Sequence, residues 1–224
     1  MDDSLPKHHC ETPSLAVAVN VYRESFRQVH ECLSRLATNM AHARVAVIFN
    51  GVDRPEIERI AVQNHFTVIR GENLGTNTNW RQWWLRMLAF FASSAAEVCL
   101  KIDPDTMVDA PPAFFPKSKY FGTVCGRFIQ GGITGLSKHA VHGLLASQIL
   151  ELDAVEGALL FPMPPAVPFM DDQLLAKALV YLGIYPEDWT ECRSVWREEI
   201  SNNPAKHAIV HPRYYPTDPV VSRR

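Results

Sequence analysis

Apolar runs alternate with amphipathic segments through the first half of the chain. Four runs rich in Val, Ile and Leu, at 15–22, 44–53, 66–70 and 97–103, have the length and composition of buried parallel strands. In the segments between them, apolar residues recur at intervals of three and four, which indicates amphipathic helices. The order of strand, helix, strand, helix, strand, helix and strand predicts a doubly wound α/β region with right-handed crossovers.

The pattern changes beyond residue 105, where Pro, Gly and aromatic residues become frequent. Shorter elements are expected there: strands near 120–125 and 128–134, and helices at 137–150 and 171–183. The proline-containing stretch 184–224 is expected to wrap the surface, and 1–13 to form a flexible leader.

Composition indicates which binding partners and which cellular compartment to expect. The 224 residues include 22 basic and 24 acidic side chains, a formal net charge of -2, so no general electrostatic attraction to nucleic acid or an anionic membrane is expected. Five scattered cysteines without a CxxC pair favour reduced thiols in the cytoplasm. Neither a signal peptide nor an apolar stretch of the roughly 20 residues that a spanning helix needs is present, so we expect at most peripheral contact with a membrane.

Polar residues follow each of the four predicted strands of the first half. In open α/β sheets, ligands bind beyond the carboxyl ends of the strands, so these residues are candidates for a binding site. They are Asn20, Tyr22 and Arg23; Asn50 and Asp53; Asn73, Asn77 and Asn79; and Asp103 and Asp105. Loops that only connect elements are also polar, so one such group alone is weak evidence for a binding site. Four groups at corresponding strand ends are stronger evidence.

Asp103 and Asp105 are the sharpest candidates. Pro104 cannot donate a ladder hydrogen bond and should end the strand, and the i, i+2 spacing lets both carboxylates point to one side. Two such charges about 4 Å apart repel by roughly 4 kcal/mol at an effective dielectric near 20, and a divalent cation reverses that repulsion. Oxygen ligands suit Mg²⁺ or Mn²⁺. A polar turn that caps a helix is the alternative.

Two other functions for these acids fit poorly. A dehalogenase-type phosphatase carries DxDx[TV] on its first strand, whereas here the fifth position is Met107 and the motif follows four predicted strands. An EF-hand loop needs Gly at position six and Glu at position twelve, where this chain has Val108 and Phe114.

The order of motifs resembles that of nucleotide-sugar-dependent glycosyltransferases of the GT-A type. DPDT after the strand EVCLKI matches their DxD motif, and NLGTNTNW resembles the Asn-x-Gly loop near the nucleotide. GGITGLSKHAV resembles the segment where a strand runs into a helix beside the acceptor, and MDDQLL resembles the acidic helix start that supplies the base in inverting members. The end of the first strand, VNVYRES, departs from the commoner Pro-x-Tyr-Asn pattern.

The resemblance implies a GT-A-like α/β fold, with a Rossmann-like, mostly parallel central sheet flanked by helices and a smaller acceptor-side half. It spans residues 14–215 as one domain, divided into a nucleotide-sugar-binding half (14–109) and an acceptor and catalytic half (110–215). Residues 216–224 are expected to form a tail. A donor site follows from it. We place in that site Asn20, Tyr22, Arg23, Asn50, Asn73, Asn77, Asp103, Gly131 and Gly132, with Tyr22 as the candidate for the nucleobase.

The resemblance also implies a metal group and a base. Asp105 would bind Mn²⁺ or Mg²⁺ directly, Asp103 would hold the ribose or a metal-bound water, and a late histidine would complete the group. We favour His211 over His207. The base would be Asp172 or, as second choice, Asp171. A helix N-terminus stabilises such a carboxylate, while each acid raises the pKa of the other. Two nearby cations, Lys206 and Arg213, could neutralise the leaving diphosphate.

The expected activity is transfer of a sugar from a nucleotide-diphosphate donor, here a UDP-sugar, to a hydroxyl of a glycan or lipid-linked acceptor. The paired acids Asp171 and Asp172 favour inversion, and a retaining mechanism is the alternative. A sugar-nucleotide nucleotidyltransferase shares the Rossmann-like half, but it needs a Gly-rich loop after the first strand, and VNVYRESFR has no glycine. A non-catalytic nucleotide-sugar-binding module of the same fold is the other alternative. Trp80, Trp83 and Trp84 fit the core, although one of them could stack on a base or sugar.

Overall fold

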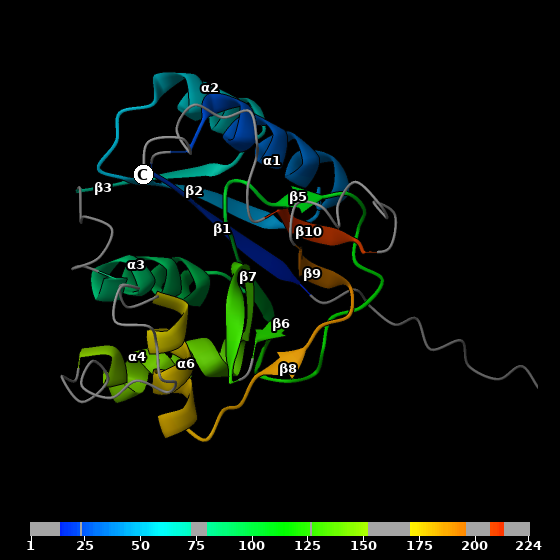
Figure 1. Cartoon of the computed structure of the whole chain (residues 1–224). Coiled ribbons are helices and arrows are strands. Elements are labelled where there is room, and N and C mark those ends of the chain that lie inside the picture. The colour runs from blue at the N-terminus through cyan, green and yellow to red at the C-terminus, as the bar shows by residue number, and fades with distance from the viewer. Residues whose placement is uncertain are drawn as a thin grey trace, which may run out of the picture.

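A seven-stranded sheet with helices on both faces forms the centre of the protein (Figure 1). The computed structural model describes residues 14–22, 24–72, 80–125, 127–151, 171–195 and 207–212. The strand order is β3-β2-β1-β4-β7-β6-β8. The strands are β1 (Leu15–Val21), β2 (Arg44–Asn50), β3 (Thr67–Gly71), β4 (Val98–Ile102), β6 (Tyr120–Cys125), β7 (Phe128–Ser137) and β8 (Glu187–Asp188).

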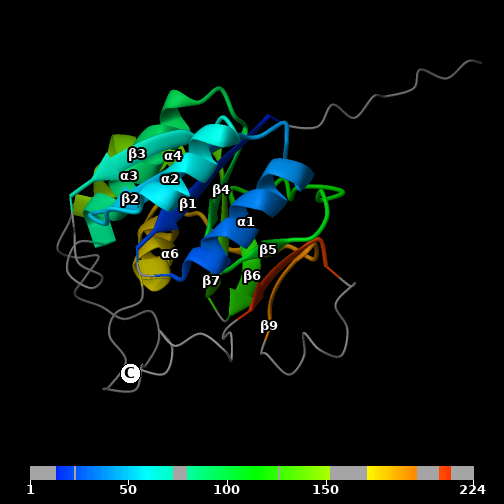
Figure 2. The same ribbon diagram turned by 90° about the horizontal axis from the view of Figure 1, so that it is seen from above.

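Two helical layers cover the sheet. On one face lie α1 (Phe26–Asn39) and α2 (Pro55–Gln63), which Figure 2 shows from above. On the other lie α3 (Trp80–Ser93), α4 (Lys138–Ser147) and α6 (Asp171–Tyr181), with the short 3-10 helix η1 (Ile149–Glu151). Strand residues alternate between the two cores: Ala16 and Ala18 of β1 pack toward α3, whereas Val17 and Val19 pack toward α1.

Local sequence explains where the first helices begin. Ser25 and Gln28 form a capping box at the start of α1, in which the Ser25 hydroxyl accepts from the Gln28 amide and the Gln28 side chain accepts from the Ser25 amide. Pro55 opens α2, where its missing N–H costs nothing. The buried residues of α1, Val29, Cys32, Leu33 and Leu36, lie three or four positions apart and face the sheet.

The strand order reverses between β1 and β4. Both neighbours of β1 run parallel to it, but β2 follows on one side through α1, and β4 is reached on the other side through α3. Such a reversal of strand order leaves an opening beyond the carboxyl ends of the two strands, which is where ligands bind in open α/β sheets. The tetrapeptide Asp103–Thr106 lies at the end of β4, beside this opening.

The second half completes the sheet differently. β7 runs antiparallel to β4, with Ile133 opposite Ile102, and carries the chain into α4 at Ser137. Three short strands form a separate sheet in the order β5-β10-β9: β5 (Met107–Val108), β9 (Cys192–Val195) and β10 (Ile209–Pro212). The expectation that 184–224 only wraps the surface is therefore wrong for β8, β9 and β10, because backbone pairing holds them in sheets.

Most predicted elements of the first half agree with the structure within a few residues. The four predicted parallel strands and the helices between them are confirmed, and 66–70 is shifted by one residue in β3. In the second half, the strand predicted near 128–134 continues to Ser137, whose side chain caps α4 by accepting from the Ala140 amide. Among the described helices, none is long and apolar enough to cross a membrane.

Candidate active site

The turn after β4 is held by one glycine of the neighbouring strand. The Asp103 amide donates to the Gly132 carbonyl at 2.7 Å, and the same carbonyl accepts from the Thr106 hydroxyl at 3.2 Å. The Thr106 amide donates to the Asp103 carbonyl at 2.9 Å, which closes a tight turn over the buried Pro104. Hydrogen bonds thus tie the turn to the sheet, and it carries Asp103 and Asp105 at the carboxyl end of β4.

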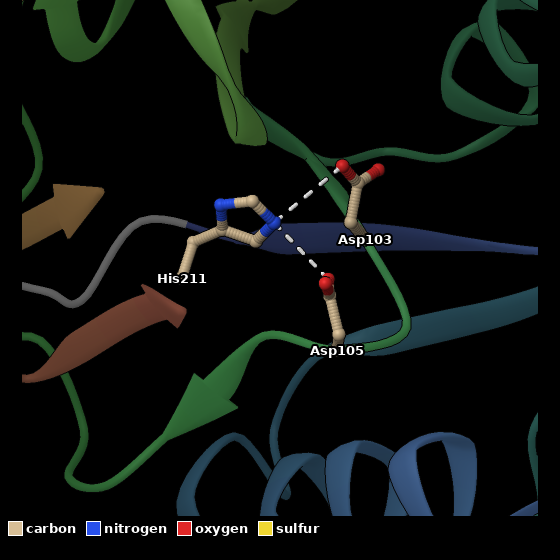
Figure 3. A group of neighbouring side chains, drawn as sticks. All are labelled: Asp103, Asp105 and His211. Carbon is tan, nitrogen blue, oxygen red and sulfur yellow. Dashed lines mark ion pairs between the residues drawn. The ribbon is translucent and has the colours of Figure 1, made fainter. Parts of the chain in front are cut away.

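Asp103 and Asp105 meet His211 from β10. The His211 Nε2 atom lies 3.1 Å from Asp105 Oδ1 and 3.9 Å from Asp103 Oδ2. Figure 3 shows the imidazole pointing between the two carboxylates, which come from the same turn. One ligand atom from each residue lies within 4.8 Å of the other two, close enough for a single ion to contact all three.

The two oxygens of Asp103 have different partners. Lys101 Nζ lies 2.6 Å from Oδ1, and the Gly132 amide donates to Oδ2 at 2.8 Å. Burial raises the pKa of Asp103, but the charges of Lys101 and His211 and the hydrogen bonds outweigh it, so the pKa lies below its usual range. Asp103 is thus kept ionised, and an ionised carboxylate is the form that binds a cation.

His211 fits beside β7 because residue 132 has no side chain. Gly132 has a φ of +74°, and a Cβ there would lie 2.1 Å from His211 Cγ. Burial lowers the pKa of His211, but the hydrogen bond and charge of Asp105, with the charge of Asp103, raise it above its usual range. His207 lies elsewhere, with Nδ1 3.1 Å from the Thr190 carbonyl oxygen. The structure therefore brings His211, and not His207, to the two aspartates.

A buried lysine connects this group to the predicted base. Lys101 projects from β4 with 3% of its side chain exposed, and its Nζ atom lies 3.8 Å from Asp172 Oδ1 as well as close to Asp103. The ammonium also lies 5.5 Å from the ring centroid of Trp83. Asp172 is the second residue of α6 and is 4% exposed. Asp171 begins the same helix, and its side chain is outside the described part.

The ends of β1 and β2 offer hydrogen-bond acceptors. The side-chain carbonyl oxygens of Asn20 and Asn50 are buried and have no hydrogen-bond partner among the residues that the structure describes. Tyr22 follows β1, and its amide donates to Glu24 Oε2 at 2.7 Å. Burial, reinforced by the charges of Asp103 and Asp105, raises the pKa of Glu24. A buried carbonyl without a partner is costly, so these two asparagines are suited to receive donors from a ligand.

Several predicted residues lie outside the described part of the chain. They are Arg23, Asn73, Asn77 and Asn79 of the predicted donor site, with Lys206 and Arg213 near the predicted diphosphate. Gly131 precedes Gly132 within β7. The donor-binding and catalytic roles assigned to individual residues stay predictions.

Sequence reasoning missed Lys101 and Glu24. Lys101 interrupts the apolar run EVCLKI, and a lysine inside a buried strand needs a partner, so that interruption was the available signal. Glu24 stands in an ordinary polar loop after β1, and no pattern in the sequence separates it from its neighbours. It contributes to the site because β1 and β4 are adjacent in the sheet.

No protein-family model and no curated protein matches this chain. Solved structures do. It superposes on the mannosyltransferase PcManGT from Pyrobaculum calidifontis, in complex with GDP-Man and Mn²⁺, with a TM-score of 0.54 and 14% identity, over 80% of this chain and 55% of that one. It also superposes on the apo form of the glycosyltransferase GlyE from Streptococcus pneumoniae TIGR4, with a TM-score of 0.57 and 12% identity. That match covers 88% of this chain and 54% of GlyE. The chain has a glycosyltransferase fold.

This glycosyltransferase fold confirms the GT-A-like architecture expected from the DxD, GG and DDQ motifs. The chain spans about half the length of these solved structures. Within the fold, Asp103, Asp105 and His211 form a possible metal-binding group beside β4. Two carboxylates and one imidazole fit Mn²⁺ well and Mg²⁺ through the carboxylates, and both ions accept further oxygen ligands from phosphates and water.

Proposed function

We propose that this protein is a metal-dependent glycosyltransferase that moves a sugar from a nucleotide-diphosphate donor to a hydroxyl of a glycan or lipid-linked acceptor. The observation that carries the proposal is the group of Asp103, Asp105 and His211 beyond the carboxyl end of β4, in a fold shared with solved glycosyltransferases. A bound Mn²⁺ or Mg²⁺ would supply positive charge where the diphosphate leaves. Asp105 and His211 would hold it, with Asp103 binding the ribose or an ion-bound water.

The donor nucleotide would occupy the ends of β1 and β2. The buried carbonyl oxygens of Asn20 and Asn50 can accept N–H donors from a base, and Tyr22 lies at the end of β1, where it could stack on that base. We propose a UDP-sugar as donor. Because PcManGT is in complex with GDP-Man, both UDP and GDP belong in the first binding test.

Asp172 is proposed as the base. Its carboxylate would take the proton of the acceptor hydroxyl as the hydroxyl oxygen bonds to the anomeric carbon and the bond from that carbon to the diphosphate breaks. A single displacement of this kind inverts the configuration. Support comes from the position of Asp172 in the first turn of α6, close to Lys101 and therefore beside the metal group. The helix N-terminus favours its ionised form.

Metal-dependent nucleotide binding tests the donor site. We expect UDP or GDP to raise the melting temperature only when Mn²⁺ is present, and Asp105→Ala or His211→Ala to remove that shift. His207→Ala is the matched control and should keep it, because His207 contacts Thr190 instead. A shift that is equally large without Mn²⁺, or that survives Asp105→Ala, would contradict the metal assignment.

Turnover separates an enzyme from a binding module. A panel of nucleotide sugars is assayed for slow hydrolysis of the donor, and we expect release of free sugar from one of them by the wild type. Asp172→Asn should bind that donor normally and lose transfer to an acceptor. Full activity of this variant would place the base elsewhere, and donor binding without any turnover would favour the non-catalytic module.

A further inference from the structure

Lys101 is a charged residue in the middle of a buried parallel strand. Its neighbours in β4, Leu100 and Ile102, are fully buried, and its own side chain is 3% exposed. Removing an ammonium ion from water is strongly unfavourable unless good partners replace the water, and an apolar side chain of similar size often stabilises such a position more. The charge at this position is therefore better explained by the site than by the stability of the sheet.

Two acidic partners of Lys101 in the described part of the chain belong to separate parts of the site. Asp103, 2.6 Å from Nζ, is in the turn that carries the metal group, and Asp172, 3.8 Å from Nζ, is in the first turn of α6. The contact between Lys101 and Asp172 is an ion pair beyond hydrogen-bond distance. The Asp172 carboxylate is therefore held by charge attraction rather than by one directed hydrogen bond. The face of Trp83 borders the same ammonium. One buried cation thus lies between the two carboxylates to which different tasks are assigned.

Lys101 also sets the orientation of Asp103. With Oδ1 paired to Lys101 and Oδ2 accepting from the Gly132 amide, the carboxylate is fixed at both oxygens, and Oδ2 lies on the side of His211. Each carboxylate oxygen has a further lone pair, so Oδ2 can still reach an ion or its water. Lys101 occupies the other oxygen and adds a positive charge next to the position of the cation.

We infer that Lys101 is a positioning residue that couples the metal group to Asp172. It orients Asp103 and holds the Asp172 carboxylate beside the donor. It also lowers the affinity for a divalent cation when no nucleotide is bound. The inference rests on the proposed function. Neutralising Asp172 should leave Lys101 free to pair more fully with Asp103 and so weaken metal binding, even though Asp172 is not assigned as a ligand.

Mn²⁺ affinity measured by calorimetry, without nucleotide, provides the readout that does not need activity. We expect Lys101→Met to bind Mn²⁺ about tenfold more tightly, since it removes a nearby positive charge and frees an oxygen of Asp103. Lys101→Arg should stay close to the wild type because it keeps the charge. Lys138→Met, which removes an exposed positive charge at the start of α4, should leave the affinity unchanged.

A double-mutant cycle separates coupling through Lys101 from a direct effect of Asp172 on the ion. Asp172→Asn should weaken Mn²⁺ binding by about threefold in the wild-type background and have no effect in the Lys101→Met background. A purely direct effect would be equal in both. In the transfer assay, we expect Lys101→Met to lower kcat by about tenfold or more while the KM for the donor changes less, as loss of positioning predicts.

The outcomes are distinguishable. Additive effects in the cycle, or unchanged Mn²⁺ affinity in Lys101→Met, would overturn the coupling while leaving the glycosyltransferase proposal intact if the wild type binds Mn²⁺ and turns over a donor. If the wild type binds no Mn²⁺, the proposed function and the coupling both fail. Should Lys101→Met not fold, Lys101→Gln, which keeps a polar end group, replaces it in the same cycle.

Discussion

The two halves of the protein bring residues to the site in different ways. In the first half, Asn20, Asn50 and Asp103 stand at the ends of β1, β2 and β4, and the register of one buried parallel sheet places them together. In the second half, Gly132 and His211 arrive through an antiparallel strand and a separate three-stranded sheet. The site thus depends on a large core for one part of its residues and on a few backbone pairs for the other.

Different interactions hold the two sets of residues in place. The strands of the first half lie between two apolar layers, and burial of that surface holds them. β10 pairs with β5 through Ile209 and Val210 and with β9 from Ile209 to Pro212, so backbone pairing within a small three-stranded sheet holds His211 in place. We therefore expect the fold and the metal group to respond to different substitutions.

The largest effect is expected in the core of the first half. Leu33 of α1 is fully buried against the sheet, and Leu33→Ala should lower the free energy of unfolding by about 2–5 kcal/mol, measured by urea denaturation. Val62→Ala, at a 60% exposed position of α2, is the control and should change it by about 0.5 kcal/mol or less. The folded fraction of Leu33→Ala should still bind Mn²⁺ normally. Weaker binding would mean that the core and the metal group are not separable.

A smaller loss of stability, with a specific loss of metal binding, is expected at Gly132. A left-handed backbone costs a residue with a side chain about 1–2 kcal/mol, and Gly132→Ala adds a Cβ 2.1 Å from His211 Cγ. Gly183→Ala is a matched control, since Gly183 has a φ of +70° and nothing within 4 Å of its added Cβ. Both variants should lose stability in urea, but Gly132→Ala alone should lose Mn²⁺ affinity. Equal affinities would show that His211 can move without cost.

The smallest effect is expected at a surface ion pair within the first half. Arg35 of α1 pairs with Asp109, which follows β5. Exposed pairs contribute about 0.2–1 kcal/mol, so Asp109→Ala should lower stability within that range and leave Mn²⁺ binding unchanged. A double-mutant cycle with Arg35→Ala measures the pair itself. A coupling well above this range would mean that this surface pair, and not the core, holds the segment after β5 against α1.

Much of the first half follows from the sequence because each element is long and its pattern is complete. The runs at 15–22 and 97–103 are mostly apolar, as expected for strands covered on both faces, and DPDT is recognisable at the end of the second. The crossover rules place the carboxyl ends of such parallel strands at one edge of the sheet, so a site that includes both Asn20 and Asp103 could be expected, whereas the adjacency of β1 and β4 is known from the structure.

The second half gives weaker signals. β10 has four residues and ends in proline, so no periodicity distinguishes it from a loop, and its pairing with β5 and β9 is set by tertiary contacts. His211 was preferred over His207 from a family resemblance alone. The sequence also contains no sign that residue 132 must lack a side chain to admit an imidazole, because that need arises from two strands distant along the chain.

The position of β10 has a consequence for the order of folding. Ile209 pairs with Val108, on the order of a hundred residues earlier, so closing this contact carries a substantial entropic cost that local structure does not offset. During synthesis, the parallel sheet can form before His211 is made. The chain should therefore pass through a state that is folded in its first half but cannot yet hold a cation in the complete group, and metal capture should be one of its last steps.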